Sequence, residues 1–356
     1  MTLLTNEYPP HVYGGAGVHV DYLSRELRNL EDGNHEIQIL CFGDQKEHSG
    51  NKIVEGIRPS FDFPSQHMRH EKLLDTLSRN IGMVRSVKET DIVHCHTWYA
   101  HLAGCLIKQM LDVPLVFTTH SLEPDRPWKE EQLGPAYGAS TWLEKTAYQN
   151  ADGVIAVSQS MKKRVHELFQ VPSEKIRIIP NGIDINEYQP RSNPSLLASY
   201  RIKPDKPFLI FVGRITRQKG TIHLVNAIKY ISPWIQIVLC AGAPDTGGIG
   251  REMEEKVKKT QTQTSNEILS GSANGSPSPT SLPFTAMPLP SSAHRCMNHL
   301  ALSTWKPWHA GHRWSPLLSE EFQKSLWSVK RVSSFLLNPW APVLRNQETR
   351  KNFLKI

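Results

Sequence analysis

At 356 residues the chain is long enough for two domains with separate cores, because single cores stop growing near about 250–300 residues. Its five cysteines lack paired spacing, which argues against a disulfide scaffold and for a reducing compartment, and no apolar run approaches the ~20 residues of a membrane span. Aliphatic runs alternate with amphipathic stretches and glycine turns. We therefore expect a soluble, cytoplasmic α/β protein.

The net charge of +7 is confined to the last quarter of the chain. Residues 270–356 contain ten Lys and Arg against three Glu, whereas residues 1–269 carry equal numbers of basic and acidic side chains. A basic folded domain would indicate a nucleic acid or an anionic surface as partner. Because residues 1–269 are balanced, we expect neither a nucleic acid nor a membrane as partner.

The chain begins with a predicted strand at Leu3 and Leu4, a glycine-rich loop and an amphipathic helix up to Leu30. Such a unit can bring backbone N–H groups and a helix N-terminus close to an anion, although a turn needed only for packing fits the pattern equally well. A dinucleotide-binding dehydrogenase is disfavoured, because no G-x-G-x-x-G with a downstream acidic residue occurs. The loop glycines are Gly14, Gly15 and Gly17.

The next predicted strand covers residues 36–42, and residues 48–89 show no decided pattern. A further strand begins near Asp91 and ends in a polar and aromatic cluster. His94 and His96 lie at strand spacing, but two ligands without a carboxylate or cysteine make a poor zinc site, so we expect no metal. The cluster contacts substrate or is structural, and its residues are His96, Thr97 and Trp98.

A buried strand over residues 114–120 ends in His120. A single histidine at a strand end is either structural or catalytic, and the polar, aromatic loop that follows it, with Glu123 and Arg126, favours a sugar-binding wall. A helix over residues 142–148 comes next. After it we predict a strand at residues 153–157, Ser158 as a helix cap, and a helix at residues 161–169.

Residues 175–184 predict a strand that runs into a tight turn containing Asn181, between two lobes, and a polar linker follows near residues 189–205. FLIFVGRITRQKG, residues 208–220, then predicts a buried parallel strand that turns at Gly213. The turn delivers Arg214 and Lys219 to the strand's carboxyl end, before an amphipathic stretch. These cations suit a diphosphate, but a basic surface turn fits the spacing as well. The next strand is expected at residues 235–240.

Five motifs occur in residues 1–268: NEYPP-x-VYGGAGVHV (6–20), VHCHTWYAHLAG (93–104), TTHSLEPDRPWK (118–129), IPNGID (179–184) and FVGRITRQKG (211–220). In this order they resemble the motifs of retaining GT-B glycosyltransferases of the bacterial glycogen synthase type. The second and third motifs are more similar to the branch that includes maltose-1-phosphate synthases than to the branch that only elongates glucans.

The resemblance implies an α/β fold with two Rossmann-like lobes whose parallel sheets face a cleft. The acceptor-side lobe, of the starch synthase catalytic type, would cover residues 1–175, and the nucleotide-sugar-binding lobe would begin at residues 176–268. The resemblance says nothing of the oligomeric state.

The resemblance also implies a donor, ADP-glucose or UDP-glucose, and an acceptor, an α-1,4-glucan or glucose 1-phosphate. Arg214 and Lys219 would hold the diphosphate and His120 would contact the transferred glucose. Cationic charge on the leaving diphosphate stabilises the oxocarbenium-like transition state, so no metal or other cofactor is required. The implied substrate-binding residues are Gly14, Gly15, Gly17, His96, Thr97, Trp98, Glu123, Arg126, Asn181 and Gly213.

Residues 270–356 depart from the family, whose E-P-F-G and G-T-P-V-V motifs are missing there. This stretch has no Asp or Tyr but five of the nine Trp, with no helical or strand periodicity. When permissible codons for residues 296–317 are read from the third base of each codon into the first two bases of the next, they can encode YEPFGIINLEAMACGTPVVAS. The first glutamate does not depend on codon choice, because the codon of Met297 ends in G and that of Asn298 begins with AA, which together give GAA. We infer a frameshift near residues 267–270, an incomplete second lobe, and a disordered or irregular basic tail over residues 269–356.

Three hypotheses remain for the chain as it stands. The first is a glucosyltransferase by descent, inactive or impaired because carboxylates of the donor site are encoded only in the other frame. The second is a non-catalytic remnant that binds glucan through its first lobe. The third takes residues 270–356 as a genuine basic, tryptophan-rich arm, which recovery of the family motif at one constant offset disfavours.

Overall fold

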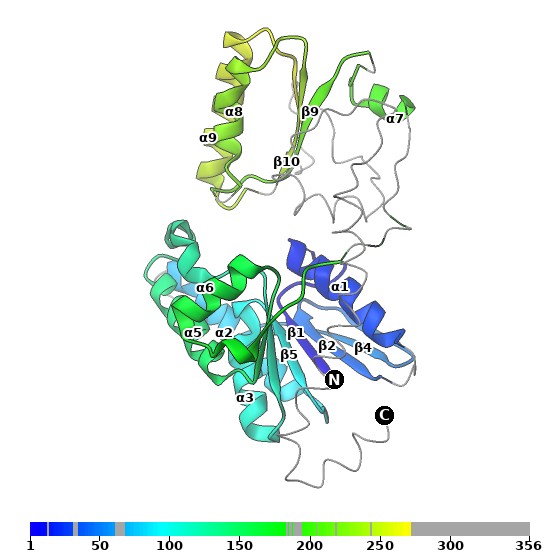
Figure 1. Cartoon of the computed structure of the whole chain (residues 1–356), viewed down its shortest axis with the longest axis vertical. Helices are drawn as coiled ribbons and strands as arrows, with labels where there is room; N and C mark the ends of the chain where they lie inside the picture. Colours follow the sequence, from blue (N-terminus) through cyan, green and yellow to red (C-terminus); the bar gives the residue numbers. More distant parts are fainter. Residues whose placement is uncertain are drawn as a thin grey trace. The chain divides into compact units, whose positions relative to one another are not determined.

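The computed structural model describes ten stretches of the chain: residues 1–12, 14–30, 35–60, 68–182, 184, 187, 194–203, 205–217, 219–242 and 244–271. Residues 272–356, where we expected disorder or irregular structure, lie outside these stretches, as does part of the predicted linker. The described residues form two compact units with a boundary between residues 183 and 184. Each unit, shown in Figure 1, is an α/β unit with a parallel sheet, as predicted.

The first unit contains an eight-stranded sheet in the order β3-β4-β2-β1-β5-β6-β7-β8. Neighbouring strands are parallel except for β3, which is antiparallel to β4 at one edge. The chain runs outward from β1 in one direction and then returns to its other side with β5, so the order reverses between β1 and β5. The strands are β1 (Thr2–Thr5), β2 (Ile37–Phe42), β3 (Lys46–Ser49), β4 (Lys52–Ile57), β5 (Val93–His96), β6 (Leu115–Thr119), β7 (Gly153–Ala156) and β8 (Ile176–Ile178).

Hydrophobic cores lie on both faces of this sheet. Leu3 and Leu4 are adjacent in β1 and fully buried, and they belong to different cores because successive side chains point to opposite faces. Helix α1 contributes Val20, Leu23 and Leu27 to the core that contains Leu3, which confirms the predicted apolar face. The other helices of this unit are α2 (Met68–Ser86), α3 (His101–Leu111), α4 (Glu130–Leu133), α5 (Ala136–Asn150) and α6 (Gln159–Phe169), after α1 (Gly15–Arg28).

Most predicted elements of this unit are confirmed, including the cap of α6, where Ser158 Oγ accepts a hydrogen bond from the Met161 amide. The undecided residues 48–89 contain the end of β3, β4 and α2. The expected lobe boundary after residue 175 needs a correction: β8 pairs with β7, so residues 176–178 belong to the first sheet.

Helix α3 packs unusually close to the sheet at Gly104. A Cβ atom added there would lie 2.3 Å from Cys95 Sγ and 2.9 Å from a Leu115 methyl group. We therefore expect Gly104→Ala to lower the free energy of unfolding by about 1–3 kcal/mol, because the helix must shift. Gly138→Ala in α5 is the matched control, since nothing lies within 4 Å of its added Cβ. Gly138→Ala should raise the free energy of unfolding by about 0.5–1 kcal/mol, because alanine favours a helix more than glycine does. Urea unfolding measures both variants, and equal effects would contradict the packing argument.

The second unit contains a three-stranded parallel sheet in the order β11-β10-β9. Helices α8 and α9 pack on one face of it through Val225, Met253 and Val257, and Tyr200 and Ile202 belong to a second apolar cluster with Val238 of β10. The strands predicted at residues 208–213 and 235–240 are confirmed. The elements are α7 (Pro194–Ser199), β9 (Phe208–Arg214), α8 (Thr221–Ala227), β10 (Gln236–Gly242), α9 (Gly247–Gln263) and β11 (Ile268–Gly271). Among the described residues, none of the helices combines the length and apolar character needed to cross a membrane.

Candidate functional site

The point where the first sheet reverses its strand order gathers most of the predicted polar residues of this unit. Strands β1, β5 and β6 are neighbours, so the residues that follow them meet at one carboxyl edge. Asn6 and Glu7 follow β1, Thr97 follows β5, and His120 follows β6. Open α/β sheets bind ligands at such an edge. The topology therefore brings together residues that are far apart in the sequence.

Three imidazoles form the centre of this edge. The ring of His19, from α1, lies 5.3 Å from that of His96 and 4.7 Å from that of His120, measured between ring centroids. The rings of His96 and His120 are stacked at 5.8 Å. Burial, reinforced by the neighbouring histidines, holds the pKa of His96 well below its usual range, so this ring is neutral at pH 7. His96 and His120, which we predicted as site residues, are thus neighbours.

Two further histidines are fully buried in the first unit. His94 Nε2 is 2.7 Å from Thr118 Oγ1, and burial lowers the pKa of His94 to about 3. His101, at the start of α3, packs on Phe117 with ring centroids 4.2 Å apart, and burial lowers its pKa to about 3 as well. Neither ring nitrogen of His101 has a hydrogen-bond partner among the described residues. These rings act as core side chains.

The buried His101 predicts a specific acid sensitivity. Its folded pKa lies below the ordinary value, so its contribution to stability is complete above about pH 6.5 and is lost as the pH falls toward 3. Between pH 7 and pH 5 this amounts to about 2 kcal/mol. His101→Phe keeps the aromatic contacts and should reduce the acid-induced loss of unfolding free energy by that amount. Urea titrations at both pH values test this, with His48→Phe, at an exposed position, as control; an unchanged acid loss in His101→Phe would sink the argument.

The glycine-rich segment forms the N-terminus of α1. Gly14 is the N-cap residue and Gly15 the first helical residue. The Gly14 amide donates a hydrogen bond to Glu7 Oε2, so part of the predicted anion site already faces a carboxylate. A Cβ at Gly17 would lie 2.7 Å from Glu7 Cβ, which makes Gly17 necessary for the close approach of helix and loop. Packing therefore accounts for Gly17, and anion binding at Gly14 and Gly15 stays a prediction.

Thr97 has a strained backbone at the end of β5. Its φ of 81° is unusual for a β-branched residue, and such conformations cost about 1–3 kcal/mol. Its hydroxyl donates a 2.7 Å hydrogen bond to Asn6 Oδ1 and so ties the end of β5 to the end of β1. Strain of this kind occurs mainly at functional sites. The observation agrees with a site at this edge, while substrate contact by Thr97 itself stays a prediction.

The predicted sugar-binding wall contains a buried ionic cluster. Glu123 Oε1 lies 3.1 Å from Lys129 Nζ and 3.3 Å from an Arg126 nitrogen, and the Glu123 side chain is 1% exposed. Glu144 of α5 accepts a 2.7 Å hydrogen bond from the Glu123 amide. Burial, and secondarily the charge of Glu123, raise the pKa of Glu144 well above its usual range. The structure thus brings Glu123 and Arg126 together as an ion pair.

Two other predicted residues occupy different surroundings. Trp98 is 3% exposed and packs in an apolar cluster with Leu133 and Leu143, so the described unit uses it as a core residue. Asn181 follows β8 at the far end of the strand order, and its buried Oδ1 has no hydrogen-bond partner in the described part of the chain. Substrate binding by these two residues stays a prediction.

The second unit places the predicted cations at the end of β9. Gly213 pairs with Ala241 in the sheet, and Arg214 is the last residue of the strand. A nitrogen of Arg214 lies 2.9 Å from Asp245 Oδ1. Burial, followed by the charge of Arg214, lowers the pKa of Lys219. The two cations are therefore close enough to interact. An anion bound between them would offset both the desolvation of Lys219 and the repulsion between the two positive charges.

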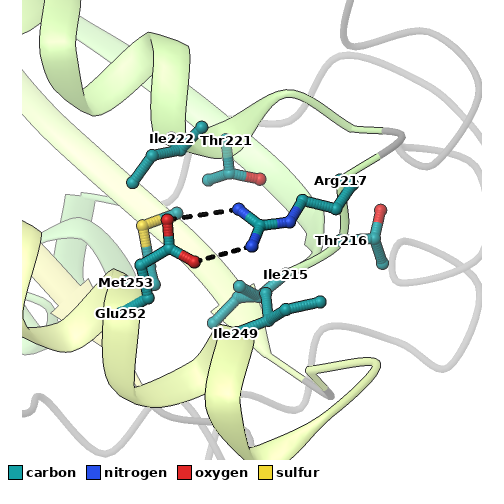
Figure 2. A pocket seen from close by; sticks show the side chains of 8 residues that line it. All are labelled: Ile215, Thr216, Arg217, Thr221, Ile222, Ile249, Glu252 and Met253. Carbon is teal, nitrogen blue, oxygen red and sulfur yellow. Dashed lines mark hydrogen bonds and ion pairs between the residues drawn. The ribbon is translucent and has the colours of Figure 1, made fainter. Parts of the chain in front are cut away.

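A small cavity lies beside this loop, against α8 and α9. Figure 2 shows it lined by four apolar side chains and two threonines, with the guanidinium of Arg217 paired to the carboxylate of Glu252. The two pairs of atoms are 2.9 and 3.1 Å apart. The volume of about 20 Å³ holds little more than one water molecule, so the cavity is no sugar or nucleotide site. Arg217 is engaged in fixing the loop to α9.

Sequence reasoning missed three residues of these sites. His19 stands between Val18 and Val20 in α1, and neither spacing nor composition marks it as a site residue. Glu144 lies inside a predicted helix, and only burial identifies it. Asp245 is the partner of Arg214 and follows the next strand, so parallel pairing of β9 with β10 could have indicated it.

Comparison with known proteins agrees with this architecture. Residues 13–187 match the family described as Glycosyltransferase Family 4. The α-maltose-1-phosphate synthase of Mycolicibacterium smegmatis is 41% identical over 264 residues, which cover 73% of this chain and 65% of the relative. The glycogen synthase of Mycobacterium tuberculosis is 28% identical over 244 residues, covering 62% of this chain and 56% of the relative. The chain thus spans less than two thirds of the length of these relatives.

Solved structures share the fold at low sequence identity. The sucrose-phosphate synthase of Thermosynechococcus elongatus matches with a TM-score of 0.56 and 19% identity, covering 75% of this chain and 69% of that protein. The catalytic domain of starch synthase IV from Arabidopsis thaliana, bound to ADP and acarbose, matches with a TM-score of 0.52 and 16% identity, covering 75% and 73%. The chain therefore carries a Glycosyltransferase Family 4 domain at residues 13–187, within an α/β fold of the GT-B type.

Proposed function

We propose that this chain descends from a retaining hexosyltransferase that transfers glucose from ADP-glucose or UDP-glucose. The observation that carries the proposal is the pair of cations at the end of β9, where the pKa of Lys219 is lowered by burial and by Arg214. A diphosphate bound here would place negative charge beside both cations. As the glucose leaves, negative charge grows on the diphosphate, and two fixed cations stabilise it without a metal. Asp245 orients the guanidinium of Arg214 for this role.

His120 is the proposed contact for the transferred glucose. It lies at the strand-order reversal of the first sheet, beside His96, where an imidazole nitrogen can exchange hydrogen bonds with sugar hydroxyls. Several residues fix this edge: Thr97 joins it to Asn6, and Glu123 anchors the following loop through Lys129. Thr97 and Glu123 then act mainly by holding the wall in place.

The acceptor that we propose first is glucose 1-phosphate, with an α-1,4-glucan second. Support comes from the relatives, since the maltose-1-phosphate synthase is 41% identical and the glycogen synthase 28%. The experiment supplies each donor with each acceptor to the frame-restored protein, in which the codons after residue 268 follow the frame that encodes YEPFG. Maltose 1-phosphate or elongated glucan is the expected product. No product from any pair would refute the proposed function.

We further propose that the 356-residue chain itself is inactive or strongly impaired, because its sequence after residue 269 lacks the family's donor-site carboxylates. Sequencing the locus in related strains tests the frameshift, which requires a single-base difference near codon 269. The alternative function is glucan binding without catalysis, favoured by the first unit, whose sheet contains all eight strands in a continuous order. Retention of the chain on glycogen, without transfer, would support this alternative.

A further inference from the structure

The imidazoles of His19, His96 and His120 converge more closely than any role so far assigned requires. One possible ligand nitrogen from each lies within 4.8 Å of the other two. They come from α1, β5 and the segment after β6, so three separate elements of the first unit hold them. The sequence presented only His94 and His96, which are too few for a metal site. The fold adds two imidazoles beside His96 and leaves His94 bonded to Thr118.

His96 is the fully buried member of the three, whereas His19 and His120 are partly exposed. Its side chain is 0% exposed, and neither ring nitrogen has a hydrogen-bond partner among the described residues. A buried polar group left in this condition costs about 1–3 kcal/mol, so natural proteins usually provide it with a partner. Its ring is flanked by those of His19 and His120 at 5.3 and 5.8 Å. A species that accepts lone pairs from all three rings would supply the missing partner.

We propose that His19, His96 and His120 bind one late first-row divalent cation, with Zn²⁺ as the representative ion. Imidazole nitrogen suits zinc, copper and nickel, whereas magnesium and calcium select oxygen ligands. Zinc lies about 2.0–2.1 Å from histidine nitrogen, which places tetrahedral ligands about 3.3 Å apart. Since the nitrogens lie within 4.8 Å of one another, zinc binding requires them to approach by at most about 1.5 Å. Three imidazoles leave the fourth position of a tetrahedral zinc ion for water.

The bound ion has a consequence that rests on the proposed function. His120 cannot donate its lone pair to a metal and to a sugar hydroxyl at the same time. Zinc at this site therefore competes with the transferred glucose and inhibits the frame-restored protein. Metal binding itself does not depend on transfer, so the two proposals can fail separately.

Titration calorimetry of the 356-residue chain with ZnCl₂ tests the site directly. We expect one saturable event per chain, which His19→Gln and His120→Gln each weaken at least about tenfold, the loss of one ligand from three. His48→Gln and His101→Phe should bind zinc like the parent chain, since neither residue belongs to the cluster. Circular dichroism verifies that each variant is folded. Mg²⁺ should give no binding heat at the same concentrations.

Co²⁺ as a second probe separates this site from cysteine-based binding. Nitrogen ligands give visible d–d bands without the near-ultraviolet charge-transfer band of a thiolate, and we expect this pattern in the parent chain but not in His19→Gln. Absence of a one-to-one event, equal affinity in parent and His19→Gln, or a thiolate band would each overturn the proposal. None of these readouts involves glucosyl transfer.

Discussion

Replacing Arg214 with methionine in the frame-restored protein is expected to lower kcat/KM for glucosyl transfer by about 10²–10³-fold, the usual cost of removing one preorganised charge-stabilising group. Methionine keeps the aliphatic bulk but removes the guanidinium that Asp245 positions 2.9 Å away. Lys219→Met should cause a similar loss. Because both cations act on charge that grows during the reaction, most of the loss should appear in kcat.

Arg217→Met is the matched control for this prediction. Arg217 stands on the same loop but pairs with Glu252 on α9 and lines the small cavity. If the loop matters only through its net charge, Arg217→Met and Arg214→Met will impair transfer equally, and the assignment is wrong. We expect the control to retain activity within about fivefold, since loss of an exposed ion pair costs at most about 1 kcal/mol. Initial rates at varied donor concentration distinguish these outcomes.

The strand positions were predictable because parallel strands buried on both faces have nearly continuous aliphatic sequences. Leu3-Leu4 and residues 115–117 are of this kind. Strand β3 has the sequence KEHS and is exposed along its whole length, so nothing in its composition marks it as a strand. It forms because β4 offers an edge for antiparallel pairing, which is a tertiary effect.

The site was predictable to the extent that it depends on strand ends. His96 is the last residue of β5 and His120 directly follows β6. Because β5 and β6 are neighbours in the sheet, the two histidines are neighbours as well. His19 could not be found this way, because its helical spacing gives no information on what faces α1 across the sheet edge. The predicted lobe boundary after residue 175 was wrong for a related reason. The sequence shows the turn at Pro180-Asn181-Gly182, but it does not show that residues 176–178 pair with β7, because this pairing depends on the fold.

Lys129→Met is expected to lower the free energy of unfolding by about 3–5 kcal/mol, the largest stability effect that we predict. Lys129 is 4% exposed, and its ammonium lies 3.1 Å from Glu123 Oε1. Without it, the buried Glu123 carboxylate keeps only one cationic partner among the described residues, Arg126, whose contact is longer at 3.3 Å. The control is Lys163→Met, which removes a 3.7 Å pair with Glu167 on the surface and should cost less than about 1 kcal/mol. Urea unfolding of both variants at pH 7 measures the difference.

The double variant Glu123→Gln/Lys129→Met separates the cost of an unpaired charge from that of lost packing. If the penalty in Lys129→Met arises from the uncompensated carboxylate, neutralising Glu123 should recover a substantial part of it. If the penalty comes from lost contacts of the Lys129 side chain with Trp98 and Tyr99, where its ammonium lies 5.9 and 5.1 Å from the ring centroids, the double variant will be no more stable.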